Sequence, residues 1–370
     1  MGKEMGMKQK FINSDTLLKL IGALICLLVV GYTENMFHLR SRYDIVRDFN
    51  SDDLAEVERN DTFGLINRSG IEIVPPMYES IGDFSEGLAR VELNDQCGFI
   101  DTQGQVVIPL KFDWVNDFQG GFAIVSLNDK RGVIDKQGKE VVPPKYDYVG
   151  GFDEGFARVE LDGKEGFVNK EGEEVVPLKY DGAENFKGGL ANVWLDNKWG
   201  IIDKQGREVV PFVYDSIGEF FEGLAVVELN DQYGFINPQG KVVIPIKYSD
   251  AGNFSEGLAA VELEEYGFIN KQGRIVIPLI YDDVGSFSEG LAPIKLNRWW
   301  GYIDKQGTIV IPPKYLDADS FDEGFGWVQS RSNGWWTYID RTGYEYGADL
   351  EEALRVRDVR RRNLPTSPKK

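Results

Sequence analysis

The sequence repeats itself with a period of 33 or 34 residues, and this repetition limits the possible folds more than any other feature. A column of glycines marks the period: Gly64, Gly98, Gly132, Gly166, Gly200, Gly234, Gly267 and Gly301. A column of prolines keeps the same spacing: Pro75, Pro109, Pro143, Pro177, Pro211, Pro245, Pro278 and Pro312. Phenylalanines do so as well: Phe84, Phe118, Phe152, Phe186, Phe220, Phe254, Phe287 and Phe321. A segment of about 34 residues buries too little apolar surface to fold alone, so neighbouring copies must stack.

The copy that begins at Gly234 shows the local pattern. Residues 235–236 and 242–244 are short β-branched and aromatic runs, which predict two strands of a hairpin. In the turn between them, Gly240 supplies a positive φ, and Asn237 is placed to hydrogen bond its own backbone. We expect Pro245 to end the second strand, because proline has no N–H to donate to a ladder.

The rest of the copy predicts further strands and no helix. Gly257 opens a third strand at residues 258–263, and residues 248–254 add a short fourth one. By the same pattern the chain enters the array at residues 54–57 as a lone third strand. It leaves the array after a ninth hairpin, near residues 344–346.

The pattern resembles the WG (or KWG) repeat family. Its carriers are the segments that begin Trp199-Gly200 and Trp300-Gly301, each followed by the hairpin turn described above. The resemblance covers Leu54 to about Gly347, and the last copy replaces the glycine with Thr337. It implies a scaffold for binding and leaves the ligand open.

The expected fold is therefore an all-β tandem-repeat array of β-meander units of about 34 residues. Two architectures stack such units. A closed β-propeller, sealed by its terminal strands, is favoured because closure removes exposed sheet edges. The alternative is an open β-solenoid, which exposes its ends.

Three regions follow from composition: a basic N-terminal segment at residues 1–50, the repeat array at 51–347, and a basic tail at 348–370. Residues 17–33 are apolar apart from Lys19 and predict an uncleaved membrane anchor. A cleaved signal peptide and a buried soluble helix are the alternatives. Met36, Leu39, Tyr43 and Val46 recur at helical spacing, which predicts a short helical stalk after the anchor.

Charge is strongly acidic and unevenly placed. The formal net charge is −19, and the array between residues 51 and 350 holds 27 basic and 52 acidic residues. An acidic surface repels phosphate backbones, so the charge disfavours nucleic acid as a partner, and we expect none. Cationic protein partners are favoured. The tail from Arg355 to Lys370 is basic and reads as a solvated terminus.

The sequence offers little catalytic chemistry. His38 is the only histidine, and the two cysteines, Cys26 and Cys97, read as small apolar side chains. Asp203 with Gly206 superficially matches a calcium loop, but Lys204 interrupts it and an Asx turn explains the pattern. We therefore expect no enzyme, no catalytic residues, no cofactor and no metal.

The aromatic residues divide into two groups. The phenylalanine column recurs in each copy, as does a tyrosine or phenylalanine column from Tyr78 to Tyr315, and both are expected in the core. The candidate binding residues are the tryptophans that do not recur: Trp114, Trp194, Trp299, Trp327 and Trp335. The sequence thus predicts a membrane-anchored scaffold that binds a protein partner through its acidic array. The alternative is a carbohydrate or cell-envelope binding module that uses these tryptophans.

Overall fold

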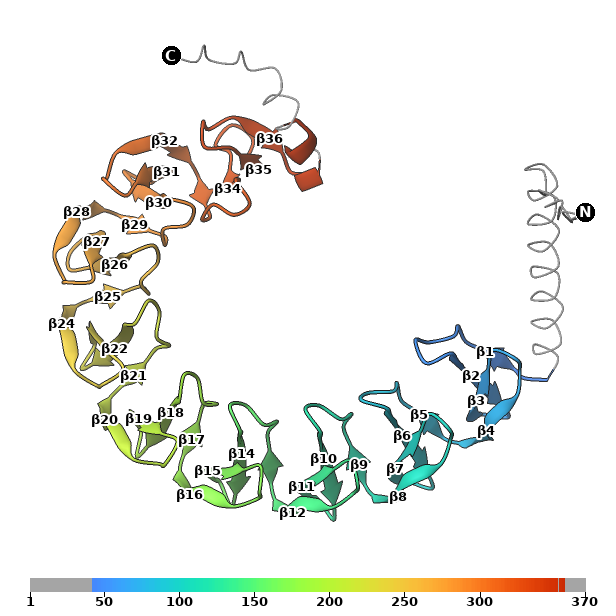
Figure 1. The fold of residues 1–370 in the computed structure, drawn as a ribbon. Coiled ribbons are helices and arrows are strands. Elements are labelled where there is room, and N and C mark those ends of the chain that lie inside the picture. The colour runs from blue at the N-terminus through green and yellow to red at the C-terminus, as the bar shows by residue number, and fades with distance from the viewer. Residues whose placement is uncertain (1–41, 352, 357–370) are drawn as a thin grey trace, which may run out of the picture. The chain divides into compact units, whose positions relative to one another are not determined.

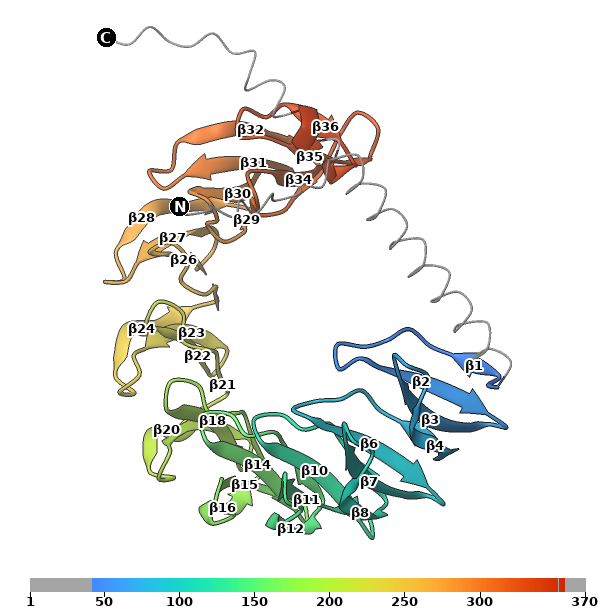
Figure 2. The same ribbon diagram turned by 45° about the vertical axis from the view of Figure 1, so that its right-hand side comes forward.

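The computed structural model describes residues 42–351 and 353–356. These residues form nine antiparallel sheets of four strands, and each sheet contains four strands that are consecutive in the chain. Figure 1 shows the sheets as separate groups that follow one another in chain order, and Figure 2 gives a second view. The predicted all-β tandem-repeat array is confirmed.

The strands of the first three sheets are short at the start and long at the end. The first sheet comprises β1 (Ile45–Val46), β2 (Leu54–Arg59), β3 (Thr62–Asn67) and β4 (Glu72–Tyr78). The second comprises β5 (Ser80–Ile81), β6 (Leu88–Leu93), β7 (Gln96–Asp101) and β8 (Val106–Phe112). The third comprises β9 (Trp114–Val115), β10 (Phe122–Leu127), β11 (Lys130–Asp135) and β12 (Glu140–Tyr146).

The next three sheets repeat this plan. The fourth comprises β13 (Tyr148–Val149), β14 (Phe156–Leu161), β15 (Lys164–Asn169) and β16 (Glu174–Tyr180). The fifth comprises β17 (Gly182–Ala183), β18 (Leu190–Leu195), β19 (Lys198–Asp203) and β20 (Glu208–Tyr214). The sixth comprises β21 (Ser216–Ile217), β22 (Ala225–Leu229), β23 (Gln232–Ile236) and β24 (Val242–Tyr248).

The last three sheets keep the plan until the final strand. The seventh comprises β25 (Asp250–Ala251), β26 (Leu258–Glu262), β27 (Tyr266–Asn270) and β28 (Ile275–Tyr281). The eighth comprises β29 (Asp283–Val284), β30 (Leu291–Leu296), β31 (Trp299–Asp304) and β32 (Ile309–Tyr315). The ninth comprises β33 (Asp317–Ala318), β34 (Gly326–Gln329), β35 (Trp336–Ile339) and the short β36 (Glu345–Gly347). Residues 350–351 and 353–356 after it are helical.

The sheets divide into two compact parts. One runs to Asp162 and also includes Phe167–Glu174, and the other comprises Gly163–Gly166 and the chain from Val175 onward.

The array begins with a complete four-stranded sheet, which corrects the predicted start of the array. Residues 54–57 are not a lone third strand, because β2 belongs to a complete sheet in which Val57 pairs with Val46 of β1. Tyr43 is buried against Ala55 and Ile66, and its hydroxyl donates a 2.7 Å hydrogen bond to Glu72. The predicted helical stalk is therefore wrong at Tyr43 and Val46. The predicted seal by terminal strands is also wrong, since each sheet is completed by its own four strands.

The strand that contains the repeated proline is longer than expected. Pro245 lies inside β24 instead of ending it. This is possible because β24 is an edge strand that pairs only with β23, so the missing N–H interrupts no second ladder. The pairing is also irregular: Tyr233 faces Tyr248 and Phe235 faces Ile244, so a bulge passes over Gly234. A Cβ on Gly234 would stand 2.8 Å from the Ile244 carbonyl oxygen, which explains the glycine column.

The predicted hairpin turn is confirmed. Gly240 has a φ of 75°. The side-chain oxygen of Asn237 accepts hydrogen bonds from the N–H groups of Gln239 and Lys241, at 3.1 and 2.9 Å. Gly257, expected to open a strand, instead closes a two-residue turn with Glu256. Both residues have positive φ, 53° and 88°, as a tight hairpin requires.

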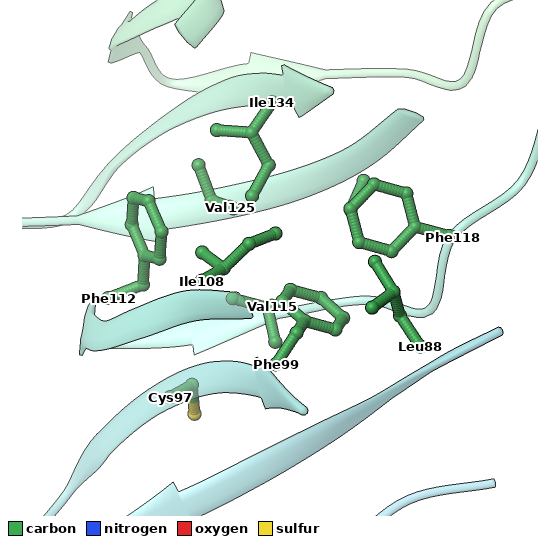
Figure 3. Packing of buried hydrophobic residues seen from close by; sticks show 10 residues of the cluster. Leu88, Cys97, Phe99, Ile108, Phe112, Val115, Phe118, Val125 and Ile134 are labelled. Atoms are coloured by element: carbon green, nitrogen blue, oxygen red, sulfur yellow. The ribbon is translucent and has the colours of Figure 1, made fainter. Parts of the chain in front are cut away.

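The core lies between neighbouring sheets. In the first part, Phe99, Ile108 and Phe112 of the second sheet belong to one cluster with Val125 and Ile134 of the third. Figure 3 shows these side chains gathered with Val115 and Phe118. The tyrosine or phenylalanine column from Tyr78 to Tyr315 is buried throughout. The phenylalanine column is buried or half-buried, so the core prediction for both columns is confirmed.

Candidate ligand-binding groove

Each sheet carries one cross-strand row whose residues change from copy to copy. In the second sheet the row pairs Ser80 with Glu92, and Glu92 with Cys97. In the third sheet the same places hold Trp114, Ser126 and Arg131. We call these three places the variable row. Because the surrounding scaffold recurs while much of the variable row does not, the row is one part of the fold that can carry a specific ligand site.

The variable rows of the second and third sheets meet at a cavity of about 230 Å³. It is lined by Ser80, Arg90, Val91, Glu92, Cys97, Trp114 and Val115. Trp114 forms the outer wall, and 45% of its surface is exposed. The cavity therefore combines an open aromatic face with charged groups and one thiol.

The polar groups of the cavity are held in fixed positions. The Ser80 hydroxyl donates a 3.0 Å hydrogen bond to the Glu92 carboxylate. The Arg90 guanidinium lies 3.7 Å from the Asp117 carboxylate. Burial raises the pKa of the Cys97 thiol, which keeps it protonated and a poor nucleophile. These groups suit recognition by hydrogen bonds and charge.

Aromatic rings and arginines alternate away from the cavity. The Arg131 guanidinium lies 6.0 Å from the Trp114 ring centroid and 5.5 Å from that of Tyr148. Arg158 lies 5.0 Å from the same Tyr148 ring. Such cation–π contacts contribute about 0.5–1 kcal/mol each at exposed sites and hold flat rings and planar cations in alternation. We call the cavity and this alternating series the Trp114 groove, and it lies wholly within the first part.

Eight consecutive segments of the chain match the family model for the WG containing repeat, at residues 63–97, 98–130, 132–164, 166–199, 199–233, 233–265, 266–298 and 300–334. The chain belongs to the WG repeat family. No curated protein matches the sequence.

Solved structures resemble this WG repeat protein only distantly. A eukaryotic initiation factor is 12% identical with a TM-score of 0.38, over 77% of this chain and 92% of that one. PorZ of Porphyromonas gingivalis is 12% identical with a TM-score of 0.24, over 83% and 52%. The extracellular domain of BT4673 from B. thetaiotaomicron is 11% identical with a TM-score of 0.28, over 83% and 60%. Likenesses this low carry no functional argument.

The tryptophan that names the WG repeat is the third member of the variable row. Trp199 and Trp300 stand there in the fifth and eighth sheets. Arg131 and Cys97 stand there in the sheets that form the Trp114 groove. The groove therefore lies in copies that lack the WG tryptophan.

Neither part holds all five predicted tryptophans. Trp114 lines the groove in the first part, and the other four belong to the second part. Trp194 lies 5.0 Å from Trp199, centroid to centroid, and the guanidinium of Arg331 covers the Trp299 ring at 4.3 Å. The remaining two differ in exposure: Trp327 is half-buried and stacks on Trp336, whereas Trp335 is 74% exposed.

Sequence reasoning missed Arg131, Tyr148 and Arg158. Single charged or aromatic residues in a long chain give no signal alone. The signal that would have found Arg131 is its place in the repeat, where it occupies the position of the WG tryptophan. Tyr148 would have followed, since it stands one repeat after Trp114.

The acidic residues explored as metal ligands have local partners. One side-chain oxygen of Asp203 accepts hydrogen bonds from the N–H groups of Gln205 and Arg207, at 3.0 and 2.9 Å. The predicted Asx turn is therefore confirmed. Glu79, Glu92 and Asp95 also gather at the surface, with Glu79 accepting from the Asn94 N–H. Glu92 accepts from the Ser80 hydroxyl.

The predicted membrane anchor at residues 17–33 lies outside the described residues. Within residues 42–351 and 353–356, the structure contains no helix with the length and apolar character needed to cross a bilayer.

Proposed function

We propose that this WG repeat protein is a non-catalytic scaffold that binds a protein partner through the Trp114 groove. One observation carries the proposal: an exposed tryptophan forms the wall of a cavity and continues into the Arg131–Tyr148–Arg158 series. Tryptophan, tyrosine and arginine are the residues most enriched at protein-binding hot spots. In this series Trp114 is exposed, and Arg131, Tyr148 and Arg158 are half-buried. Together they give a surface that takes up apolar and aromatic side chains and pairs with carbonyl or carboxylate oxygens.

The acidic array adds long-range attraction to this local recognition. The region between residues 51 and 350 has 25 more acidic than basic residues, which favours the approach of a cationic partner. The partner we propose is therefore basic overall and contacts the groove with an aromatic or apolar segment. Binding of such a partner weakens as salt is added.

A peptide selection tests this proposal. A random peptide library is selected on the full-length chain, and the enriched peptides are titrated against Trp114→Ala and Trp335→Ala. Trp335 is the matched control, since it is 74% exposed and does not line the groove. We expect Trp114→Ala to weaken binding about tenfold or more and Trp335→Ala to leave it unchanged. Equal binding to wild type and Trp114→Ala would contradict the proposal.

Carbohydrate binding is the second candidate. It is favoured by the exposed Trp114 ring beside the Glu92 carboxylate, because sugars offer apolar ring faces and hydroxyl groups together. Titration of cell-envelope glycans against tryptophan fluorescence separates the candidates. Saturable quenching that is lost in Trp114→Ala supports carbohydrate binding and displaces the protein-partner proposal.

We also propose that residues 17–33 anchor the array at a membrane, with the array on the extracytoplasmic side. The support is the apolar composition of this segment after Lys3, Lys8 and Lys10. The full-length chain is expected to pellet with membranes and to resist carbonate extraction, whereas the array lacking residues 1–50 is expected in the soluble fraction. Recovery of the intact full-length chain in the soluble fraction would contradict the anchor.

The array is proposed to curve as a β-propeller, with an open solenoid as the alternative. The support is that each sheet is a four-stranded antiparallel meander, which is the unit from which propeller blades are built. Spin labels on the first and ninth sheets test the proposal. A short, narrow distance distribution is expected for a closed ring, and a long distance would favour the solenoid.

A further inference from the structure

A glutamate clamp links the tight turns of successive repeats. In the second part, Glu222 adopts a φ of 50°, in the left-handed region that glutamate seldom occupies. Its carboxylate accepts a 3.1 Å hydrogen bond from the N–H of Gly257, one repeat later. The Lys271 ammonium lies 2.9 Å from the same carboxylate and donates to the Glu222 backbone oxygen, also at 2.9 Å. The clamp thus holds one carboxylate between an N–H and a lysine.

The clamp recurs in the first part. Glu86, with a φ of 51°, accepts a 3.1 Å hydrogen bond from Gly121 and forms a 2.9 Å ion pair with Lys136. Together, Lys136 and the hydrogen bonds from Gly120 and Gly121 outweigh the effect of burial and lower the pKa of Glu86. The lysine stands 50 positions after the glutamate. At Glu222 the spacing to Lys271 is 49, because that repeat is one residue shorter, and the spacing identifies the equivalent residues in other repeats.

One repeat keeps the lysine and lacks the carboxylate. Gly120 stands in the glutamate position with the same backbone conformation, at a φ of 59°. The lysine 50 positions later is Lys170, and the equivalent N–H belongs to Gly155. Among the described residues, no carboxylate lies within ion-pair distance of Lys170, whose ammonium lies 5.6 Å from the Phe122 ring centroid.

A second repeat also has glycine in the glutamate position, but it lacks the lysine as well. Gly188 also replaces the glutamate, with a φ of 58°. There the position 50 residues later is Pro238, so the carboxylate and the cation are lost together. Among the glutamate positions in the described residues, only Gly120 therefore leaves the lysine without the carboxylate that pairs with it in other repeats.

A cavity of about 510 Å³ opens at this point, within the first part. Its lining includes Gly120 and Phe122 together with three lysines and three acidic residues: Lys136, Lys139, Lys170, Asp135, Glu140 and Glu171. A Cβ built on Gly120 would have no other atom within 4 Å, so the space that the glutamate would enter is open. Lys136 is already paired with Glu86, and Glu140 with Lys111. In the part of the chain that the structure describes, Lys170 has no carboxylate at ion-pair distance, so a carboxylate from outside the chain has room to pair with it.

We propose that this cavity binds a carboxylate group, held by the Lys170 ammonium and the Gly155 N–H in the place that a glutamate occupies in other repeats. The ligand is a carboxylate because the chain itself places a carboxylate in the equivalent cradle. It comes either from an acidic side chain of a peptide or from a free organic acid. This site is separate from the Trp114 groove, and its occupancy does not depend on the function proposed for that groove.

Calorimetric titration of the full-length chain tests the site. The probes are glutarate and the peptide acetyl-Gly-Glu-Gly-amide, with sodium chloride added to equalise ionic strength. Lys170→Gln removes the cation, and Gly120→Glu supplies the missing carboxylate from the chain. Gly188→Glu is the matched control, since the same substitution there meets Pro238 instead of lysine.

We expect saturable binding of at least one probe to wild type and to Gly188→Glu. Binding should be about tenfold or more weaker in Lys170→Gln and in Gly120→Glu, because each loses the charge-assisted pair. Tighter binding of the peptide identifies a peptide side chain as the source, and tighter binding of glutarate identifies a free acid. If Gly120→Glu does not fold, Lys170→Gln alone decides. Absence of saturable binding to wild type, or equal binding to Lys170→Gln, overturns the proposal.

Discussion

The indole ring of Trp194 occupies the space in which Gly182 would carry a side chain. A Cβ on Gly182 would stand 2.6 Å from Cζ2 of this ring. The two residues are cross-strand partners, the first and second members of the variable row in the fifth sheet. The large side chain at the second place of the row is thus accommodated by a glycine at the first place.

This match predicts that Gly182→Ala displaces Trp194. A methyl group cannot share the space of the ring, and overpacking of this kind costs about 1–3 kcal/mol of unfolding free energy. Denaturant melts should show the loss, and tryptophan emission should shift to longer wavelength as the ring moves into water. The double variant Gly182→Ala with Trp194→Ala removes the conflict. Its loss of unfolding free energy should therefore be smaller than the sum of the losses in the two single variants. Strict additivity would show that the ring does not depend on the glycine.

The WG glycines are predicted to resist even alanine. A Cβ on Gly267 would stand 2.7 Å from the Ile277 carbonyl oxygen, and this backbone atom cannot move without disturbing the bulge. Gly267→Ala should therefore cost about 3 kcal/mol or more in unfolding free energy. Chemical denaturation followed by circular dichroism provides the measurement.

Thr337→Ala is the matched control for Gly267→Ala. Thr337 occupies the glycine position in the ninth sheet, where β36 is only three residues long. Its hydroxyl accepts a 2.9 Å hydrogen bond from the Gly347 N–H. Its loss should cost about 1 kcal/mol, as for an ordinary hydrogen bond. Similar losses of unfolding free energy in the two variants would mean that the close approach of β28 does not explain why glycine stands at position 267.

The sequence predicted what local chemistry determines. The period, the Asn237 to Gly240 turn and the buried tyrosine column each follow from residues close in the chain. The sequence did not predict where one sheet ends and the next begins. The hairpin that starts at Gly234 completes its sheet at Tyr248, and the next sheet begins at Asp250. Pro245 also lies inside a strand opposite Gly234 because the strand pairing has a bulge there, and the alternation of apolar and polar residues does not predict that bulge.

The candidate site was predictable only in part. Trp114 was found because a tryptophan that does not recur stands out in a repeat. Its partners Arg131 and Tyr148 come from a different strand and from the next sheet. Their proximity depends on how neighbouring sheets stack, which a single sequence does not state. The same holds for Lys170, whose lack of a carboxylate is visible only once the clamp geometry is known.

The hairpin glycines should differ in their tolerance of asparagine, which accepts positive φ better than most residues. A Cβ on Gly240 would stand 2.7 Å from the Val209 carbonyl oxygen, whereas on Gly307 the nearest atom is a methyl group of Ile277 at 3.5 Å. Gly307→Asn should therefore lower the unfolding free energy by less than about 1 kcal/mol, and Gly240→Asn by clearly more. Thermal melts of the two variants make the comparison. A larger loss for Gly307→Asn would contradict the packing argument.

The glutamate clamp predicts a loss of stability in acid. The Lys271 ammonium, with the Gly257 N–H, lowers the pKa of Glu222 below its ordinary value of 4.5, against the opposing effect of burial. A lowered pKa means that folding favours the ionised form, so the contribution is fully present above 4.5. It is lost as the pH falls through the lower folded-state value. Wild type should thus lose stability in this range in part through Glu222.

Glu222→Gln isolates this contribution from that of the other carboxylates. The amide cannot ionise, so the variant should be less stable than wild type at about pH 7, and the difference should shrink as the pH falls below 4.5. Urea melts at low salt from about pH 7 to about pH 3 follow the difference. Glu264→Gln serves as the control, because Glu264 lies on the exposed turn after β26 and forms no clamp. A difference between wild type and Glu222→Gln that stays constant with pH would show that Glu222 stabilises the turn by its shape and not by its charge.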